Sequence, residues 1–109
     1  SDGMGIVHFV EGQITYLGRG GGGLVSVGDI TRIKLQEQET DSTWIIEQPA
    51  NPALHIPTNA KGADRLFDAF VLLPKWNVEF TLSRLEDSSS HEDVIWQSEH
   101  YLNQSRYIH

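Results

Sequence analysis

Short runs of β-branched and aromatic residues, separated by polar or glycine-containing segments, occupy the N-terminal half of the chain, a pattern that is typical of strands. Residues 6–17 are rich in β-branched and aromatic side chains and are interrupted at Glu11–Gly12. This run predicts two short strands, or one strand that is kinked at Gly12. The polar stretch 36–43 predicts a strand end that runs into an exposed hairpin loop. Further strands are predicted at 24–27, 30–35, 44–47 and 54–56.

The segment 60–73 has helical spacing instead. Its apolar residues recur every three or four positions and form one stripe, which consists of Ala63, Leu66, Phe67, Phe70 and Leu73. Thr58 or Asn59 can accept hydrogen bonds from the free amides of the first turn, and Pro74 ends the run. We therefore predict one amphipathic helix of about fifteen residues, long enough to lie across a sheet.

Clean alternation of apolar and polar residues appears after the helix. Val78, Phe80 and Leu82 alternate with polar residues, which predicts a half-buried strand over 78–83. Residues 86–93 are polar and predict an exposed turn, and 94–96 predict a strand that pairs back as a β-hairpin. The tail 100–109 shows no clear period and fits a last strand, a short helix or a loosely ordered end.

Composition places the chain among single globular domains. Its 109 residues include 39% apolar residues, with no apolar run near the length needed to span a bilayer. We expect one α+β domain, 1–109, with a large antiparallel sheet, in which residues 1–3 look like a cloning remnant before Met4. The absence of cysteine excludes disulfides, thiolate zinc sites and cysteine nucleophiles, and it fits a cytoplasmic protein.

The net charge of −7 argues against binding to nucleic acids and makes attachment to a membrane an unfavourable alternative. Only eight lysines and arginines oppose this charge. Arg32 and Lys34 share one face of a predicted strand. Together with Arg19 and Arg84, they are the only residues from which an anion-binding site could plausibly be built. Trp76 follows Pro74–Lys75 and could face a partner, whereas Trp44 and Trp96 are expected to pack in the core. The candidate contact residues are therefore Arg19, Arg32, Lys34 and Trp76.

The segment Leu17–Val25 contains four consecutive glycines behind Arg19. A phosphate-binding loop requires a helix directly after the glycines, but Leu24–Val27 is typical of a strand. An RNA contact of the arginine–glycine type requires repeated arginines in a basic segment. The segment therefore predicts a hairpin connection with a mobile tip.

No motif indicates catalysis, and we expect neither a catalytic residue, a cofactor nor a metal. His91, Glu92, Asp93 and His100 are close in sequence but lack a recognised metal-ligand spacing, so a solvated turn is the preferred interpretation. No serine lies in a nucleophile motif. Glu37 and Glu39 share a strand face, which is far more often a solubilising face than an acid–base pair. His8 and His55 are expected to be structural.

The order of the segments resembles a known family. "VEGQITYLG" with a following strand, then "DITRIKL", a tryptophan strand, and "LHIPTNA" leading into a helix with "LFDAF", is similar to small bacterial PH-like (pleckstrin-homology-like) domains. The resemblance covers about residues 6–74. It implies a strongly bent antiparallel sheet, or a partly open barrel, packed against the amphipathic helix. Seven strands precede the helix in a standard PH domain but five or six do so here, so a variant topology or a different α+β fold is expected.

The resemblance implies binding or assembly more than catalysis. Our first hypothesis is a non-enzymatic domain that self-associates, with a homodimer as one form, or docks a protein partner through a sheet edge such as 54–56 or through an aromatic patch. The second is a small-ligand carrier or an enzyme with a pocket between the helix and the sheet. The third is peripheral binding to membrane lipids.

Overall fold

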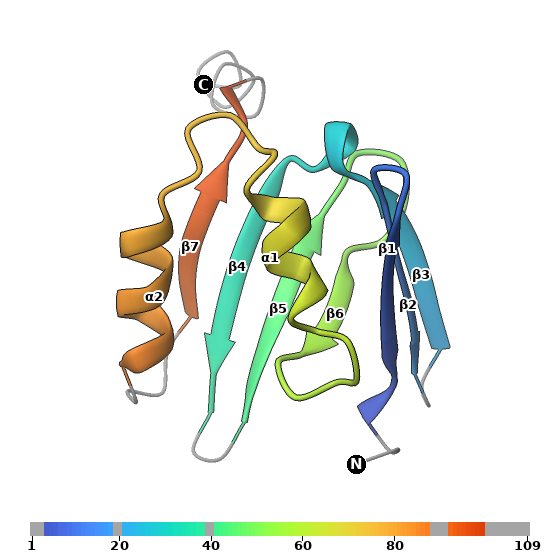
Figure 1. Cartoon of the computed structure of the whole chain (residues 1–109), viewed down its shortest axis with the longest axis horizontal. Coiled ribbons are helices and arrows are strands. Elements are labelled where there is room, and N and C mark those ends of the chain that lie inside the picture. Colours follow the sequence, from blue (N-terminus) through green and yellow to red (C-terminus); the bar gives the residue numbers. More distant parts are fainter. Residues whose placement is uncertain (1–3, 19–20, 39–40, 88–91, 100–109) are drawn as a thin grey trace.

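Two antiparallel sheets form most of the computed structural model, which describes residues 4–18, 21–38, 41–87 and 92–99 (Figure 1). The three-stranded sheet has the order β1-β2-β3, with bounds Ile6–Val10, Gln13–Gly18 and Gly21–Ser26. The four-stranded sheet has the order β6-β5-β4-β7, with bounds Leu54–Pro57, Ser42–Glu47, Arg32–Glu37 and Glu92–Gln97. The expected α+β class with antiparallel sheets is confirmed, and the described strands do not close into a barrel.

A tight hairpin joins β1 to β2. Its two turn residues, Glu11 and Gly12, have φ angles of 53° and 77°. Positive φ at both positions defines the turn whose twist matches that of the flanking strands. The run 6–17 therefore forms two strands, which was one of the two predicted arrangements, and Val7 and Ile14 face the core from them.

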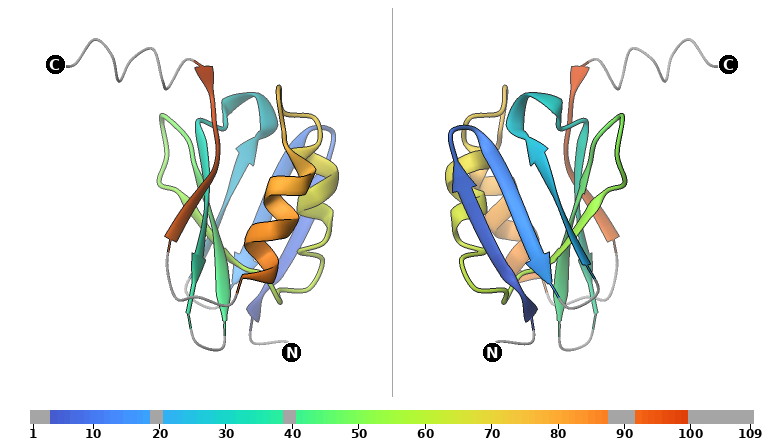
Figure 2. Two further views of the ribbon diagram at one scale, coloured as in Figure 1. Left: turned by 90° about the vertical axis from the view of Figure 1, so that its left-hand side faces the viewer. Right: turned by 90° about the vertical axis from the view of Figure 1, so that its right-hand side faces the viewer.

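The two α-helices of the described residues, α1 (Arg65–Phe70) and α2 (Val78–Glu86), lie on one side of the four-stranded sheet (Figure 2). Helix α1, Arg65–Phe70, buries Leu66, Ala69 and Phe70 completely against the sheet. A short 3-10 helix, η2 (Val27–Asp29), connects β3 to β4 at one end of the molecule. None of the helices in the described segments is long and apolar enough to cross a membrane.

Helix α1 is shorter than the predicted helix over 60–73, although the predicted apolar stripe does face the core. The preceding residues form turns because they are attached to β1. Lys61 accepts a backbone hydrogen bond from Val7 and donates one to Gly5. Gly62 has a φ of 80°, and a Cβ there would lie 2.5 Å from the Val7 carbonyl oxygen. Close contact with β1 therefore prevents a regular helix before residue 65.

The predicted strand over 78–83 is wrong, because these residues belong to helix α2, Val78–Glu86. The Asn77 side chain caps the helix by accepting a hydrogen bond from the Phe80 amide (2.9 Å). Thr81 is the buried residue of α2, and the alternating residues Val78, Phe80 and Leu82 are 49%, 40% and 50% exposed. The period-2 pattern misled because only a strand would have placed these three side chains on one face.

The predicted β-hairpin after the helix is therefore also wrong. Strand β7 pairs with β4, with a register shift between Ile33 and Lys34. Trp96 lies opposite Ile33 and donates from its indole Nε1 to the Pro74 carbonyl oxygen (2.8 Å). The predicted tail 100–109, Arg19, Glu39, His91 and His100 lie outside the described residues.

Candidate binding groove

The predicted cationic pair lies on the solvent face of the four-stranded sheet and is neutralised there. Arg32 donates to both carboxylate oxygens of Glu47, at 3.1 and 3.0 Å. Lys34 Nζ lies 3.2 Å from Glu47 and 3.3 Å from Glu92. Ile45, the cross-strand neighbour of Lys34, is buried among these charges. Arg32 and Lys34 thus share a face as predicted, but two carboxylates already occupy them.

These contacts shift the pKa values of the pair. Burial alone would raise the pKa of Glu47, but the hydrogen bonds and charges of Arg32 and Lys34 outweigh it, and the pKa lies below its ordinary value. Burial alone would lower the pKa of Lys34, but Glu47 and Glu92 raise it. Both groups are therefore held in their charged forms.

Arg84 does not join this cluster. It lies on α2, where it forms ion pairs with Asp87 and Asp93. Asp93 is opposite the buried Leu35, so it lies on the inner face of the sheet. Lys34 precedes Leu35 and lies on the other face. The structure therefore separates Arg84 from Arg32 and Lys34.

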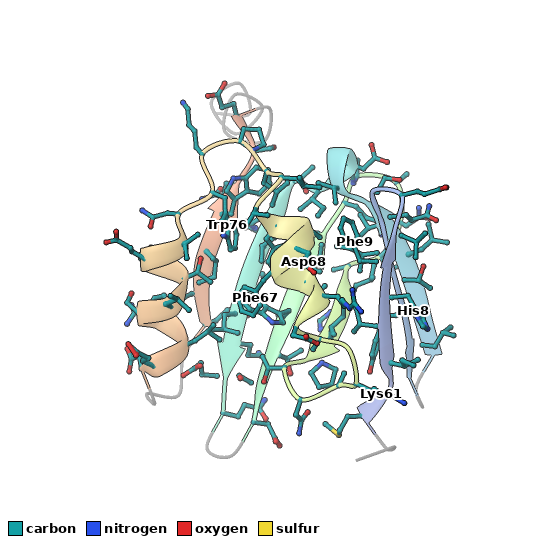
Figure 3. All side chains as sticks on the ribbon, in the orientation of Figure 1. His8, Phe9, Lys61, Phe67, Asp68 and Trp76 are labelled. Atoms are coloured by element: carbon teal, nitrogen blue, oxygen red, sulfur yellow. The ribbon has the colours of Figure 1, made fainter. Side chains whose placement is uncertain are left out.

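The space between α1 and the sheet is filled by aromatic rings. Trp44, on β5, packs edge-on against Phe70 and Phe67, with ring centroids 5.3 and 6.0 Å away. Trp76 is half-buried and lies 5.1 Å from Phe70. Phe67 and Trp76 lie on the side of α1 that faces α2 (Figure 3). We call Trp44, Phe67, Phe70 and Trp76 the aromatic junction.

Two hollows lie away from α1. The smaller, of about 550 Å³, lies where the chain after α1 meets the end of β7. Its floor includes Leu73 and Trp96, and an exposed ion pair between Lys75 and Glu99 (2.8 Å) lies at its rim. Both rim side chains are largely exposed, so an ionic contact with either of them would add little to the binding energy of a ligand.

The larger hollow, of about 740 Å³, lies between the edge of the three-stranded sheet and the edge of the four-stranded sheet. It is within the volume range of ordinary ligand sites. We call it the β3–β6 groove, and its lining consists of Tyr16, Gly21, Gly22, Gly23, Leu24, Gln48, Asn51, Pro52, Ala53, Leu54 and His55.

The glycine segment forms one wall of the groove. The hairpin interpretation of this segment is confirmed, but three of the four glycines are strand residues, because Gly21 pairs with Gly18 and Gly23 with Tyr16. The tip, residues 19–20, lies outside the described residues. A Cβ on Gly22 would lie 2.1 Å from the Tyr16 carbonyl oxygen, so only glycine fits there without moving β2.

The edge of β3 presents backbone groups to the groove. The Leu24 carbonyl oxygen accepts a hydrogen bond from the Gln48 side-chain amide (3.1 Å), so this carbonyl points away from β2. In an antiparallel ladder both backbone groups of one residue point the same way, and the direction alternates along the strand. The Leu24 amide and both backbone groups of Gly22 therefore point out of the sheet, and within the described residues no hydrogen bond is recorded for them.

The opposite wall is β6, which the sequence predicted as a strand over 54–56 that offers a sheet edge. That prediction is confirmed, since β6 is the terminal strand of its sheet and pairs only with β5 among the described strands. The Thr58 amide donates to the Ser42 carbonyl oxygen. By the same alternation, the backbone groups of His55 point away from β5. Two strand edges thus border one groove.

Among the described residues, the lining of the groove includes no lysine, arginine, aspartate or glutamate. Within the described residues, no group of three or more histidines and acids is placed to hold a metal ion. The arrangement offers backbone hydrogen bonds, the amides of Gln48 and Asn51, and apolar contacts. This chemistry suits the recognition of another polypeptide.

Sequence reasoning missed the roles of Gly22, Gln48 and Tyr16. The available signal was the glycine run that follows the strand residues up to Leu17. The antiparallel register pairs Gly21–Gly23 with Tyr16–Gly18. The position of Gln48 depends on how two sheets approach each other, for which the sequence carries no local signal.

No family model, curated protein or solved structure matches this chain. The resemblance to PH-like domains therefore stays a prediction, and the function is inferred from the groove.

Proposed function

We propose that this chain is a binding domain that docks an extended segment of a partner protein along the edge of β3. The segment would add a strand to the three-stranded sheet and lie in the β3–β6 groove. The observation that carries this proposal is the row of outward-pointing backbone groups on Gly22 and Leu24 beside the groove. Main-chain hydrogen bonds of this kind provide affinity in strand-addition complexes.

The side chain of Gln48 supports this use of the edge. Its amide already donates to the Leu24 carbonyl oxygen, as a neighbouring strand would. The same amide donates to the Pro52 carbonyl oxygen (3.3 Å), which ties the β5–β6 loop to β3 and closes one end of the groove. An incoming segment would continue the ladder from Leu24 toward Gly21.

Unoccupied strand edges are usually blocked, which makes this edge informative. Pro57 ends β6 without a backbone donor, and β1 is covered by the turn that carries Lys61. Lysine, proline and covering loops are common protections against unwanted strand pairing. Gly21–Leu24 has none of these protections, and its glycines let another backbone approach closely.

Two substitutions at one position test the proposal. Leu24→Pro removes the outward amide, which takes no part in the ladder with β2, and Leu24→Thr removes the same leucine side chain but keeps the amide. A library of extended peptides displayed on phage is selected against the immobilised chain, and enriched peptides are synthesised. We expect Leu24→Pro to weaken their binding about tenfold or more in fluorescence anisotropy, and Leu24→Thr to change it less than about threefold.

A measurement on the unaltered chain covers the case in which Leu24→Pro fails to fold. Peptide binding should slow the hydrogen exchange of the Gly22 and Leu24 amides. Peptides that leave both amides unprotected, or a selection that enriches no peptide, would overturn the proposal. Light scattering tests whether the edge binds a second copy of the chain instead. A dimer that is lost in Leu24→Pro but kept in Leu24→Thr would overturn the proposal of a separate partner protein.

A further inference from the structure

Resting on the proposed function, we infer that the docked segment is uncharged and inserts one large apolar side chain into a preformed hollow over Gly21 and Gly23. This inference names the class of partner sequence. It depends on three properties of the groove: space on the inner side of β3, a fixed aromatic wall, and described lining residues that carry no acidic or basic side chain.

The space exists because two inward positions of β3 carry no side chain. Gly21, Gly23 and Val25 alternate with outward residues, and Val25 is completely buried, so the two glycines also face inward. A Cβ on Gly21 would meet nothing within 4 Å. A Cβ on Gly23 would meet only the Leu54 side chain, at 3.5 and 3.7 Å. The hollow therefore reaches the apolar core at Leu54, which is buried.

Tyr16 keeps the hollow open. As the cross-strand neighbour of Gly23, its ring could cover that glycine. Instead the ring lies close to Gly18 and Gly5, because a Cβ on Gly18 would lie 2.8 Å from Tyr16 Cζ and one on Gly5 2.7 Å from Tyr16 Cε1. The Tyr16 hydroxyl donates to the Met4 carbonyl oxygen (2.9 Å) and fixes this position. A ligand thus meets a wall that is already in place, which reduces the entropy lost on binding.

The lining sets the polarity of the segment. A charged side chain placed against Tyr16 and Leu54 would lose hydration and find no oppositely charged partner among the described lining residues. Asn51 and His55 are exposed, so they lie at the rim, where they can bind the segment's backbone. The acidic surface of the rest of the molecule therefore does not decide what enters this groove.

The test uses Gly23→Leu, which fills the hollow from β3 but leaves the outward groups of Gly22 and Leu24 in place. The peptides selected on the unaltered chain should share one large apolar residue with uncharged neighbours. Replacing that residue with Asp should weaken binding more than tenfold, and Gly23→Leu should weaken the unaltered peptide about as much. Gly28→Leu, at a glycine with open space around it, is the control and should have no effect.

The outcomes separate this inference from the proposal on which it rests. If Leu24→Pro abolishes binding but Gly23→Leu does not, the edge is used and the hollow is not, which overturns only the inference. Peptides enriched in charged residues at every position would also overturn it. If Gly23→Leu destabilises the chain, the unaltered protein provides the test instead. Nuclear Overhauser effects between the peptide's apolar residue and Tyr16 or Leu54 would support the inference, and their absence would overturn it.

Discussion

The aromatic junction and the β3–β6 groove border the same four-stranded sheet, but large side chains fill one and are missing from the other. At the junction, Trp44 and Phe70 are almost completely buried and their rings touch. In the groove, Gly21 and Gly23 leave the inward side of β3 without side chains, and Leu54 and Tyr16 line the space beside them. One region is built for cohesion. The other keeps backbone groups and an apolar wall accessible, which a region devoted to stability would not do.

The largest expected effect comes from breaking the junction. Phe70→Ala should lower the free energy of unfolding by about 3–5 kcal/mol, because it leaves a cavity between Trp44 and Trp76. The measurement is urea unfolding followed by tryptophan fluorescence. Phe80→Ala on α2 is the matched control, and since Phe80 is 40% exposed its loss should stay below about 1 kcal/mol. Equal losses would show that α2 is packed as tightly as α1.

A smaller loss is expected from the wall of the groove. Gly22→Ala should lower the free energy of unfolding by about 1–3 kcal/mol, because its Cβ would clash with the Tyr16 carbonyl oxygen and force β2 and β3 apart. Gly28→Ala, where a Cβ meets nothing, should stay within about 0.5 kcal/mol. If Gly22→Ala were as stable as the unaltered chain, the close approach of β2 and β3 would not require glycine, and the groove wall would be less constrained than the junction.

The smallest effect concerns the charged face of the sheet that both regions border. Glu47 precedes Gln48, which closes the groove, and its pKa is held below the ordinary value of 4.5. A carboxyl group with a lowered pKa stabilises the folded state above the ordinary value, and this contribution is lost as the pH falls through 4.5 toward the folded pKa. Lys34, with its raised pKa, keeps its contribution until the pH rises through 10.5.

Glu47→Gln should therefore cost on the order of 1 kcal/mol at pH 7 and progressively less as the pH falls below 4.5. Thermal unfolding of both chains between pH 7 and pH 3 checks this, and the two curves should converge in acid. Peptide binding at pH 7 should be unchanged, because Glu47 is not among the described residues that line the groove. A weaker binding by Glu47→Gln would show that the charged face helps to position Gln48.

Much of the fold followed from local patterns. The strands before residue 57 were predictable because runs of β-branched and aromatic residues between polar turns favour extended backbone, and the strand at 54–56 does form a sheet edge. The apolar stripe of α1 was predictable because Leu66 and Phe70 are four positions apart, and this spacing places both side chains on the same face of a helix. The pattern at 78–83 failed, since α2 buries Thr81 and packs Leu85 against the core, and the alternating apolar residues stay exposed.

The candidate site was less predictable. Arg32 and Lys34 share a face, as strand periodicity requires, but the sequence does not reveal that Glu47 and Glu92 neutralise them. Trp76 packs on Phe70 across a turn in which Lys75 adopts a φ of 60°. The residues of the groove come from three separate segments and meet only because β3 and β6 end their sheets side by side.

By itself the sequence determined the class of fold, the inward faces of its strands and of α1, and the glycine hairpin, because each depends on periodicity or turn chemistry within a few residues. Only the tertiary structure decided the helix at 78–86, the partner of β7 and the groove between two sheet edges. These depend on contacts between residues distant in the chain, and such contacts are selected by packing of the whole molecule and leave no local periodicity.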